Sequence, residues 1–291
     1  MFDKFDKFDK ELYSEMDYEK RYMVALEAFL RRVSIVNMPF ALKGSLLTRQ
    51  YFPSHIERYV DDLDFFYMEK IFDVAGADNI FTNWMCKVTT QYVDDGIEFR
   101  DFRENTFWRM IDYAMDDDFP TVNTDIDYNV TDIEEDGLCL DISFNLDINT
   151  EFIPLMYKPI FGDEFVVPYT IPLPVQIAWK LHQTIIRPRY KDLYDLKFLI
   201  SHPSYDSLGA EETLKVLADE CRHDKTVTEE KRNIAFAENI TQIHKKIFKD
   251  YFWIDSEWKL VPEDISLEVI WDLGEIMQKA GLTDVAFQKH F

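Results

Sequence analysis

Two aspartates one residue apart are the side chains of this sequence best suited to chemistry. They lie in the segment Asp61-Asp62-Leu63-Asp64-Phe65. Side chains on a β-strand alternate between its two faces, so Asp62 and Asp64 should project together while Leu63 and Phe65 enter a core. Paired carboxylates supply the oxygen ligands that Mg²⁺ prefers when it also binds phosphates. The pattern therefore indicates metal-assisted phosphoryl or nucleotidyl transfer.

A short turn ahead of these aspartates offers a place for phosphate. Lys43, Gly44 and Ser45 follow an apolar strand predicted over 38–42 and precede a short helix predicted over 46–51. Backbone N–H groups at such a turn bind anions. We therefore expect the amides of Gly44 and Ser45 to hold a polyphosphate.

A solvated acidic edge is the alternative interpretation of the paired aspartates. The chain has 55 acidic residues, and it contains a second pair of this kind at Asp125-Ile126-Asp127. An isolated pair is therefore weak evidence. The order of apolar strand, Gly-Ser turn, short helix and apolar-flanked aspartates is what favours a metal site.

A third carboxylate would complete such a site, either as a metal ligand or as a general base. Asp141 is the best choice, because it lies mid-strand in Leu140-Asp141-Ile142-Ser143-Phe144, a stretch otherwise built for burial. The alternative is a polar residue on the open face of a half-exposed strand.

A basic island stands out in this acidic chain. Over residues 171–200 two aspartates, Asp192 and Asp195, accompany five cations, which are Lys180, Arg187, Arg189, Lys191 and Lys197. Lys180 lies inside an apolar helix predicted over 175–186, where a bare charge is costly without a partner. Either a phosphate or one of the two aspartates, in a structural bridge between helices, would satisfy it.

Composition restricts the class of protein. The 291 residues carry a formal charge of −23, which repels nucleic acid at long range and argues against a nonspecific DNA or RNA binder. No apolar run is long enough to cross a bilayer. The three cysteines, Cys86, Cys139 and Cys221, form no metal motif and are interpreted as small apolar fillers in a reducing compartment. We expect a soluble, cytoplasmic protein without a membrane partner.

The pattern of elements changes near residue 170. Strands are predicted over 38–42, 63–67, 125–130, 138–146 and 152–158, and helices over 16–36, 46–51, 105–115, 175–186, 193–200, 210–221, 229–248 and 267–279. A mixed half followed by a helical half predicts an α/β (α+β) fold with two domains, over 1–168 and 169–291.

These motifs together resemble the AbiEii/AbiGii-type nucleotidyltransferases, the toxins of type IV toxin–antitoxin and abortive-infection systems. The resemblance covers roughly residues 38–200. It rests on Leu42-Lys43-Gly44-Ser45, on Arg58-x-Val60-x-Asp62-Leu63-Asp64-Phe65, and on Lys180 followed by Arg187 and Lys191-Asp192-Leu193-Tyr194-Asp195-Leu196. The family's pattern runs approximately K-G-G-T, R-x-S-x-D-[LI]-D-F, a helix with an inner Lys, and R-D-x-x-D-[LIF].

Four positions depart from that pattern. Ser45 replaces the second glycine of the turn, and Leu46 stands where relatives often carry a hydroxyl. Val60 replaces Ser or Thr, which removes any hydroxyl-based modification there. Lys191 replaces Arg and loses bidentate phosphate binding. None of these changes removes a metal ligand.

The resemblance implies a polymerase-β-like nucleotidyltransferase core, with a C-terminal helical domain closing the nucleotide cleft. Asp62, Asp64 and Asp141 would hold Mg²⁺ or Mn²⁺. Lys180 would neutralise the leaving pyrophosphate, and Asp195 would orient Lys180 or the substrate. The residues implied at the NTP are Lys43, Gly44, Ser45, Arg58, Lys180, Arg187 and Asp192.

The implied reaction moves a nucleoside monophosphate from an NTP to an acceptor hydroxyl, with RNA, specifically tRNA, as the implied acceptor. A cognate antitoxin is the implied partner. Two alternatives stay open. One is a catalytically silent relative that binds a nucleotide or a protein, which suits the strong negative charge. The other is an enzyme that nucleotidylates a protein or a small molecule.

Overall fold

The computed structural model describes residues 10–109, 120–130, 133–134, 137–146, 148, 150–247, 251–254 and 257–291. The chain divides into two compact units. Unit 1 contains residues 1–50 and 59–171, and unit 2 contains residues 51–58 and 172–291. The segment 51–58, which the sequence pattern places with the N-terminal half, therefore belongs to unit 2.

A six-stranded mixed sheet forms the centre of unit 1, in the order β4-β7-β2-β1-β9-β8. Its central strand β2 runs parallel to β7 and antiparallel to β1. The edges come from β4, antiparallel to β7, and from β8, antiparallel to β9. The strands are β1 (Phe40–Leu42), β2 (Asp62–Tyr67), β4 (Thr121–Ile126), β7 (Leu138–Ser143), β8 (Ile153–Tyr157) and β9 (Phe165–Thr170).

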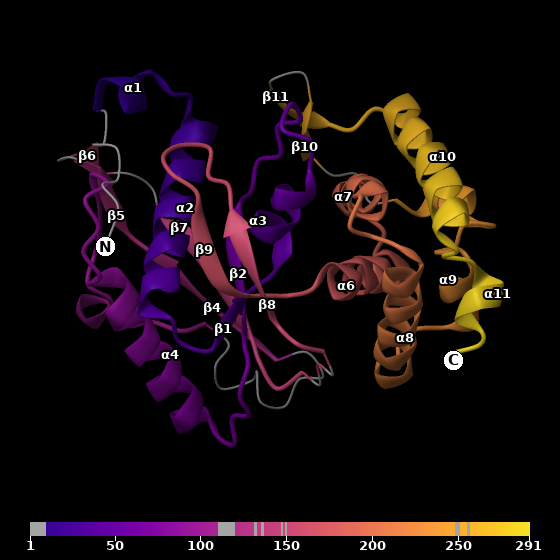
Figure 1. The fold of residues 1–291 in the computed structure, drawn as a ribbon, viewed down its shortest axis with the longest axis horizontal. Helices are drawn as coiled ribbons and strands as arrows, with labels where there is room; N and C mark the ends of the chain where they lie inside the picture. The colour runs from indigo at the N-terminus through magenta and orange to yellow at the C-terminus, as the bar shows by residue number, and fades with distance from the viewer. Residues whose placement is uncertain are drawn as a thin grey trace. The chain divides into compact units, whose positions relative to one another are not determined.

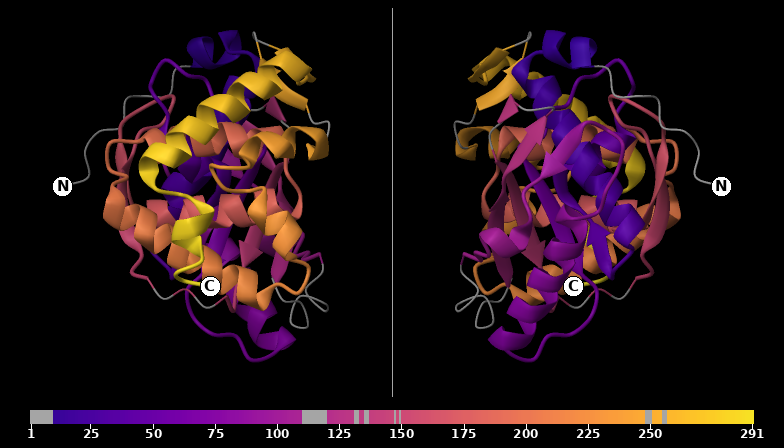
Figure 2. Two further views of the ribbon diagram at one scale, coloured as in Figure 1. Left: turned by 90° about the vertical axis from the view of Figure 1, so that its right-hand side faces the viewer. Right: turned by 90° about the vertical axis from the view of Figure 1, so that its left-hand side faces the viewer.

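Two helices, α2 (Tyr18–Val36) and α4 (Val74–Thr89), pack together over one side of this sheet (Figure 1 and the right panel of Figure 2). The ring of Trp84 on α4 joins them to the strands. It stacks on Phe40 of β1 at 3.9 Å between centroids and meets Phe29 of α2 and Phe65 of β2 edge-on. This aromatic core fixes which face of β2 is buried.

The remaining elements of unit 1 are short. A second sheet has the order β3-β5-β6, and a one-turn helix α3 follows β1. Their bounds are α1 (Lys10–Glu15), α3 (Gly44–Thr48), the 3-10 helices η1 (Arg49–Tyr51, which continues into unit 2) and η2 (Phe102–Glu104), β3 (Ile97–Phe99), β5 (Tyr128–Val130) and β6 (Ile133–Glu134).

Unit 2 is largely helical (left panel of Figure 2). Helix α6 packs on α7 and α8, and α10 packs on α7. Its elements are α6 (Leu173–Ile186), α7 (Tyr190–Ser201), α8 (Ser207–His223), α9 (Glu229–Asn233), η3 (Ile240–Lys246), β10 (Tyr251–Ile254), β11 (Glu257–Leu260), α10 (Glu263–Ala280) and α11 (Asp284–Phe287). The predicted fold class, a mixed α/β half followed by a helical half, is confirmed.

Local signals explain where several helices begin and end. Asp17 caps α2 by accepting a hydrogen bond from the Lys20 N–H, and Asn37 ends that helix in the left-handed conformation. Pro172 precedes α6, whose first turn also contains a proline. Gly281, at φ 81°, ends α10.

Two predicted helices are wrong. Over the described residues 105–109 the chain is not helical, because the Arg109 N–H donates to the Asn123 carbonyl in a β-bridge. Residues 110–115 of that prediction lie outside the described residues. The helix predicted over 229–248 is α9 and η3 instead, and the Ala237 N–H between them donates to the Leu282 carbonyl. Pairing with distant backbone overrides the local helical pattern in both places.

Helix α4 and strand β9 are present in the structure but were not predicted from the sequence. Strand β9 contains Pro168, which discourages a strand prediction because it donates no hydrogen bond. Within the described part of the chain, no helix has the length and apolar character needed to span a membrane.

Candidate active site

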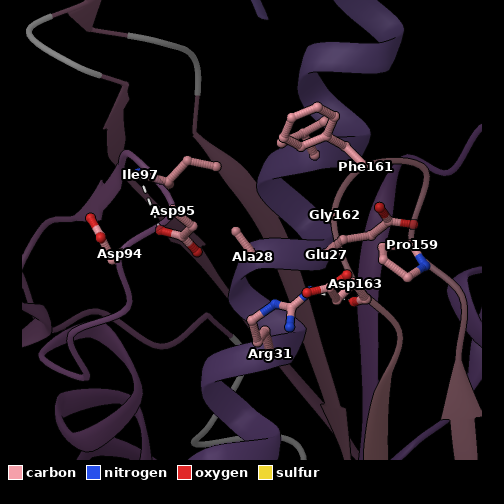
Figure 3. Close-up of a pocket in the computed structure, with 11 residues that line it drawn as sticks. Glu27, Ala28, Arg31, Asp94, Asp95, Ile97, Pro159, Phe161, Gly162 and Asp163 are labelled. Carbon is pink, nitrogen blue, oxygen red and sulfur yellow. Dashed lines mark hydrogen bonds between the residues drawn. The ribbon is translucent and has the colours of Figure 1, made fainter. Parts of the chain in front are cut away.

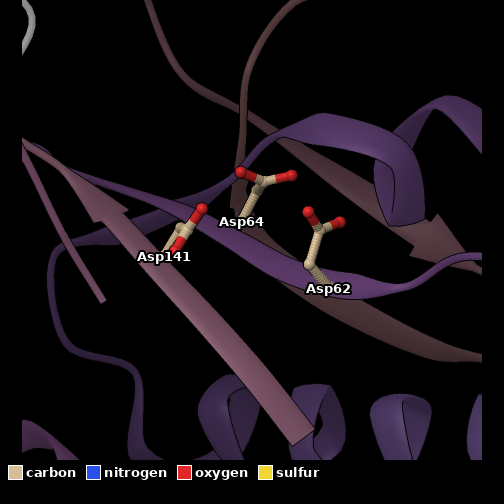
Figure 4. Close-up of side chains that lie close together, drawn as sticks. All are labelled: Asp62, Asp64 and Asp141. Carbon is tan, nitrogen blue, oxygen red and sulfur yellow. The ribbon is translucent and has the colours of Figure 1, made fainter. Parts of the chain in front are cut away.

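Three carboxylates gather on neighbouring strands of the central sheet. The strand pairing of β2 with β7 places Asp64 opposite Asp141. One ligand oxygen from each of Asp62, Asp64 and Asp141 lies within 4.8 Å of the others. Figure 4 shows the three side chains projecting toward a common point from these two strands. We call these three residues the carboxylate cluster.

Alternation along β2 explains how the cluster arises. Leu63 and Phe65 are fully buried, whereas Asp62 and Asp64 are only partly buried on the opposite face. The apolar residues are therefore the reason that both carboxylates point away from the core. This confirms the predicted orientation of β2; the metal role of the cluster stays a prediction.

The turn before α3 lies directly against Asp64. The Lys43 N–H donates to the Asp64 carbonyl at 3.0 Å, and the Lys43 ammonium donates to the Asp64 carboxylate at 3.0 Å. Three carboxylates and one ammonium give these four side chains a formal charge of −2. The donors are hard oxygens, so the set fits a divalent cation such as Mg²⁺.

Only glycine fits at the start of α3. Gly44 has φ 68°, and a Cβ atom at this position would overlap the Asp64 carboxylate. Lys43 is the N-cap residue of α3 and provides no side-chain cap. The backbone can approach the carboxylate cluster this closely because Gly44 lacks a side chain.

The environment of Asp141 favours its neutral form. Burial raises its pKa, the nearby Asp64 charge raises it further, and Lys43 opposes both effects. A carboxylate with a raised pKa is a stronger base, and it gains more from a bound cation than an ordinary one does.

The second aspartate pair has a different environment. Asp125 on β4 forms a salt bridge with Arg109, and Asp127 forms one with Arg100 at 3.3 Å. These carboxylates are about half exposed and each has an arginine partner. They match the solvated acidic edge that was the alternative for an isolated pair.

Unit 2 contains a separate set of charges, the ion-pair network of Arg58, Lys180, Arg189, Asp192 and Asp195. Arg58 binds the Asp195 carboxylate through two donors, at 2.9 Å and 3.1 Å. Lys180 donates to Asp195 at 2.9 Å and lies 3.6 Å from Asp192. Arg189 binds Asp192 through two donors, at 2.7 Å and 3.2 Å.

The two aspartates of this network are buried, and each is close to two cations. Asp195 is fully buried and Asp192 nearly so. Burial alone would raise the pKa of Asp195, but the charges of Arg58 and Lys180 outweigh it and hold that pKa at about 2. The two aspartates likewise raise the pKa of Lys180 against the effect of its burial. The bridge between helices that the sequence analysis left open is thus present, and the catalytic role of Lys180 stays a prediction.

Most of the basic island finds its partners within unit 2. Besides Lys180 and Arg189, Lys197 forms a salt bridge with Asp272 of α10 at 2.5 Å. At least three of the five cations in the island are therefore already paired with carboxylates. The local reason for the island is, in large part, the acidic residues that it packs against.

One residue of the site region was misread in the sequence. Cys139 is exposed, so it is no apolar filler, whereas Cys221 is buried. Cys139 pairs in register with Asp62 and lies two residues before Asp141 on β7. The alternation of β7 was the signal for this placement, since it puts Cys139 on the same face as Asp141.

Comparisons with known proteins identify a family for the chain and solved structures that are similar to it. Residues 28–279 match the model of a family described as nucleotidyl transferase AbiEii toxin, type IV TA system. The fold is similar to MenT4, a nucleotidyltransferase toxin of Mycobacterium tuberculosis H37Rv, with 15% identity, a TM-score of 0.54, and 94% of this chain and 87% of that chain covered.

A second similar structure is that of JHP933 from Helicobacter pylori, which is 19% identical with a TM-score of 0.48. The match covers 92% of this chain and 95% of the JHP933 chain. No curated protein sequence matches this one. The family match covers most of the residues of both units, so it is not limited to one motif.

Proposed function

The chain belongs to the AbiEii family of nucleotidyltransferase toxins from type IV toxin–antitoxin systems, and from this premise we propose how it works. It moves a nucleoside monophosphate from an NTP to an acceptor hydroxyl, with Mg²⁺ held by Asp62, Asp64 and Asp141. The observation that carries the proposal is the carboxylate cluster, whose ligand oxygens lie within 4.8 Å of one another beside the Gly44 turn.

Each residue of the candidate site in unit 1 has a role in this proposal. Asp62 and Asp64 would hold the cation, and a cation bound there would neutralise charge on the phosphate oxygens. Asp141 is a third ligand or accepts the proton of the acceptor hydroxyl, a role that suits its raised pKa. The amides of Gly44 and Ser45 bind phosphate, and Lys43 adds a positive charge next to Asp64.

The first experiment measures Mg²⁺-dependent NTP turnover in Asp64→Asn. We expect a loss of about 10³-fold, because an electrostatic contribution to the transition state disappears. Asp127→Asn is the matched control, since it removes a carboxylate from the second aspartate pair, which is bound to Arg100. Normal turnover in Asp64→Asn would refute the assignment.

Lys180 needs a test of its own. Lys180→Met keeps the length and apolar packing of the side chain but removes the charge that Asp195 and Asp192 share. Weaker NTP binding in calorimetric titrations, relative to Lys197→Met, would support the predicted contact with phosphate. Equal NTP affinity in the two variants would leave Lys180 with its structural role.

For the acceptor we propose an RNA hydroxyl, on the strength of the family resemblance. With a formal charge of −23, the chain should bind RNA weakly and with a steep salt dependence. Labelled NTPs incubated with total RNA should label a tRNA-sized band, and Asp64→Asn should lose it. Label in protein would indicate a protein acceptor, and no label with any of the four NTPs would indicate a silent relative.

The family also implies a partner, because type IV toxins have a cognate antitoxin. We propose that such an antitoxin restrains the activity of the carboxylate cluster in the cell. Expression of Asp64→Asn should then be tolerated without an antitoxin, whereas the wild type should slow growth. Equal growth with both proteins would argue against toxicity through this site.

A further inference from the structure

A buried carboxylate outside the candidate site links α2 to the segment that follows the Gly44 turn. Glu27 on α2 is only 3% exposed. One carboxylate oxygen accepts hydrogen bonds from the Arg49 guanidinium at 3.0 Å and the Tyr157 hydroxyl at 3.1 Å. The other accepts from the Ile160 N–H at 2.8 Å. Glu27 thus joins three segments that are distant in the sequence.

Arg49 follows α3 directly, so this contact fixes the far end of that one-turn helix. The next residue strengthens the attachment, because the Gln50 side chain accepts from the Lys158 N–H at 2.8 Å and donates to its carbonyl at 3.3 Å. The near end of α3 is held by Lys43 on Asp64. Helix α3 is therefore tied to Asp64 at one end and to Glu27 at the other.

We propose that Glu27 is a positioning residue for nucleotide binding. Acting through Arg49, it holds α3 so that the amides of Gly44 and Ser45 stay beside Asp64. The inference rests on the proposed role of this turn in binding phosphate. Glu27 contacts neither Asp64 nor Gly44 among the hydrogen bonds of the described residues, so its effect is expected on NTP affinity and not on the chemical step.

The charges around Glu27 make this attachment depend on pH. Arg49 of η1, Tyr157 of β8 and Arg31 of α2 face the carboxylate. A cavity of about 50 Å³ lies beside it, and its wall also contains Asp94, Asp95 and Asp163 (Figure 3).

Burial raises the pKa of Glu27 to about 7, against the opposing charge of Arg49. Because Arg49 lowers that pKa, the ionised carboxylate holds Arg49 more tightly than the neutral acid does. The contact between Glu27 and Arg49 should therefore hold α3 more firmly as the pH rises through 7. The stability of the fold changes in the opposite direction, because a raised pKa contributes stability at low pH that is lost as the pH rises through 7.

The test compares the pH dependence of the KM for NTP in wild type, Glu27→Gln and Arg49→Met. In wild type KM should rise as the pH falls below 7. Glu27→Gln should have a KM raised roughly 5- to 10-fold at pH 8, a kcat within about twofold, and no such step near pH 7. The double variant Glu27→Gln/Arg49→Met should have the same KM for NTP as Arg49→Met, because both substitutions break the same contact between Glu27 and Arg49. A Glu27→Gln profile that parallels wild type would overturn the proposal.

Asp95→Asn is the matched control. Asp95 pairs with Arg32, one turn further along α2, and this ion pair is also largely buried. The variant should lose stability without changing the KM for NTP, because the hydrogen bonds that Arg32 forms with described residues go to Ala28, Gln91, Asp95 and Ile97 and not to α3. An equal rise in KM for Asp95→Asn and Glu27→Gln would reduce Glu27 to a general stabilising role and overturn the proposal.

Hydrogen exchange separates this inference from the proposed function. Glu27→Gln should speed exchange of the amides of residues 46–48 at pH 8, whereas Asp95→Asn should not. Unchanged exchange in Glu27→Gln would refute positioning whatever the protein's activity. Faster exchange with an unchanged KM would refute the phosphate role of α3 and, with it, the inference.

Discussion

The carboxylate cluster of unit 1 and the ion-pair network of unit 2 use the same kind of residue for opposite purposes. In unit 1, three aspartates share a small volume with one ammonium. In unit 2, two aspartates are surrounded by three cations. The pKa shifts follow this difference, since that of Asp141 is raised and that of Asp195 is lowered to about 2.

The difference shows how a functional charge can be distinguished from a structural one. A network in which each aspartate is paired with cations holds its own elements together and gains little from a further cation. A cluster of like charges lowers the stability of the fold until a cation binds. A fold that keeps such a cluster therefore contains a candidate cation-binding site. Four experiments test this difference between the two groups of charges.

The largest effect on stability should come from a substitution in the ion-pair network of unit 2. Asp195→Asn removes the buried carboxylate that Arg58 binds and one of the two carboxylates near Lys180. Breaking a buried ion pair costs about 3–5 kcal/mol, so the free energy of unfolding in urea should fall by that amount. Asp64→Asn is the comparison, and it should change stability by less than about 1 kcal/mol. Equal losses in the two variants would remove the distinction between the clusters.

A slightly smaller effect should follow from crowding the carboxylate cluster. Gly44→Ala adds a Cβ atom that overlaps the Asp64 carboxylate, at a residue with φ 68°. Turnover should fall about 10²-fold, because misplacing a ligand of the site disturbs the reacting geometry.

Gly281→Ala separates this clash from backbone strain. Gly281 has φ 81°, but a Cβ atom there would meet nothing within 4 Å. It should therefore show the strain of about 1 kcal/mol without a loss of turnover. Similar turnover in the two glycine variants would mean that strain alone explains the effect.

Acid should affect the two clusters in opposite directions. The pKa of Asp195 lies below its ordinary value of 3.8, so its stabilising contribution is present above 3.8 and is lost as the pH falls toward 2. This contribution amounts to about 2 kcal/mol. Unfolding free energies between pH 4 and pH 2 should therefore fall less steeply in Asp195→Asn than in wild type. Parallel curves would show that Asp195 is not held as the network implies.

The smallest effect concerns Asp141. Because its pKa is raised, its negative charge costs stability as the pH rises through that pKa. Asp141→Asn should stabilise the metal-free protein by about 1 kcal/mol, or a melting temperature roughly 2–4 °C higher. The same variant should lose the stabilisation by Mg²⁺ that wild type shows. A lower melting temperature in Asp141→Asn would mean that its charge supports the fold.

Much of the first cluster could be predicted from local pattern. Leu63 and Phe65 are apolar and alternate with Asp62 and Asp64, so the direction of both carboxylates follows from the period of a strand. Asp141 could be singled out for the same reason. That Asp141 lies opposite Asp64 could not, because parallel pairing between β2 and β7 joins segments separated by 77 positions.

Other features depended on distant partners that no local pattern reveals. The sequence shows that Lys180 is a charge in an apolar helix, but not that Asp195 is shared between it and Arg58. It places Glu27 on a helix without indicating that Arg49, Tyr157 and Ile160 converge on its carboxylate.

Local sequence was enough to predict most of the strands and helices, the place of the glycine turn, the paired aspartates and the family to which the chain belongs. These depend on neighbouring residues and their order, which local sterics and burial control. Which charges are paired with opposite charges became clear from the tertiary structure alone. Coulombic interactions depend on distance in space and on burial, and both are set by how segments far apart in the sequence pack together.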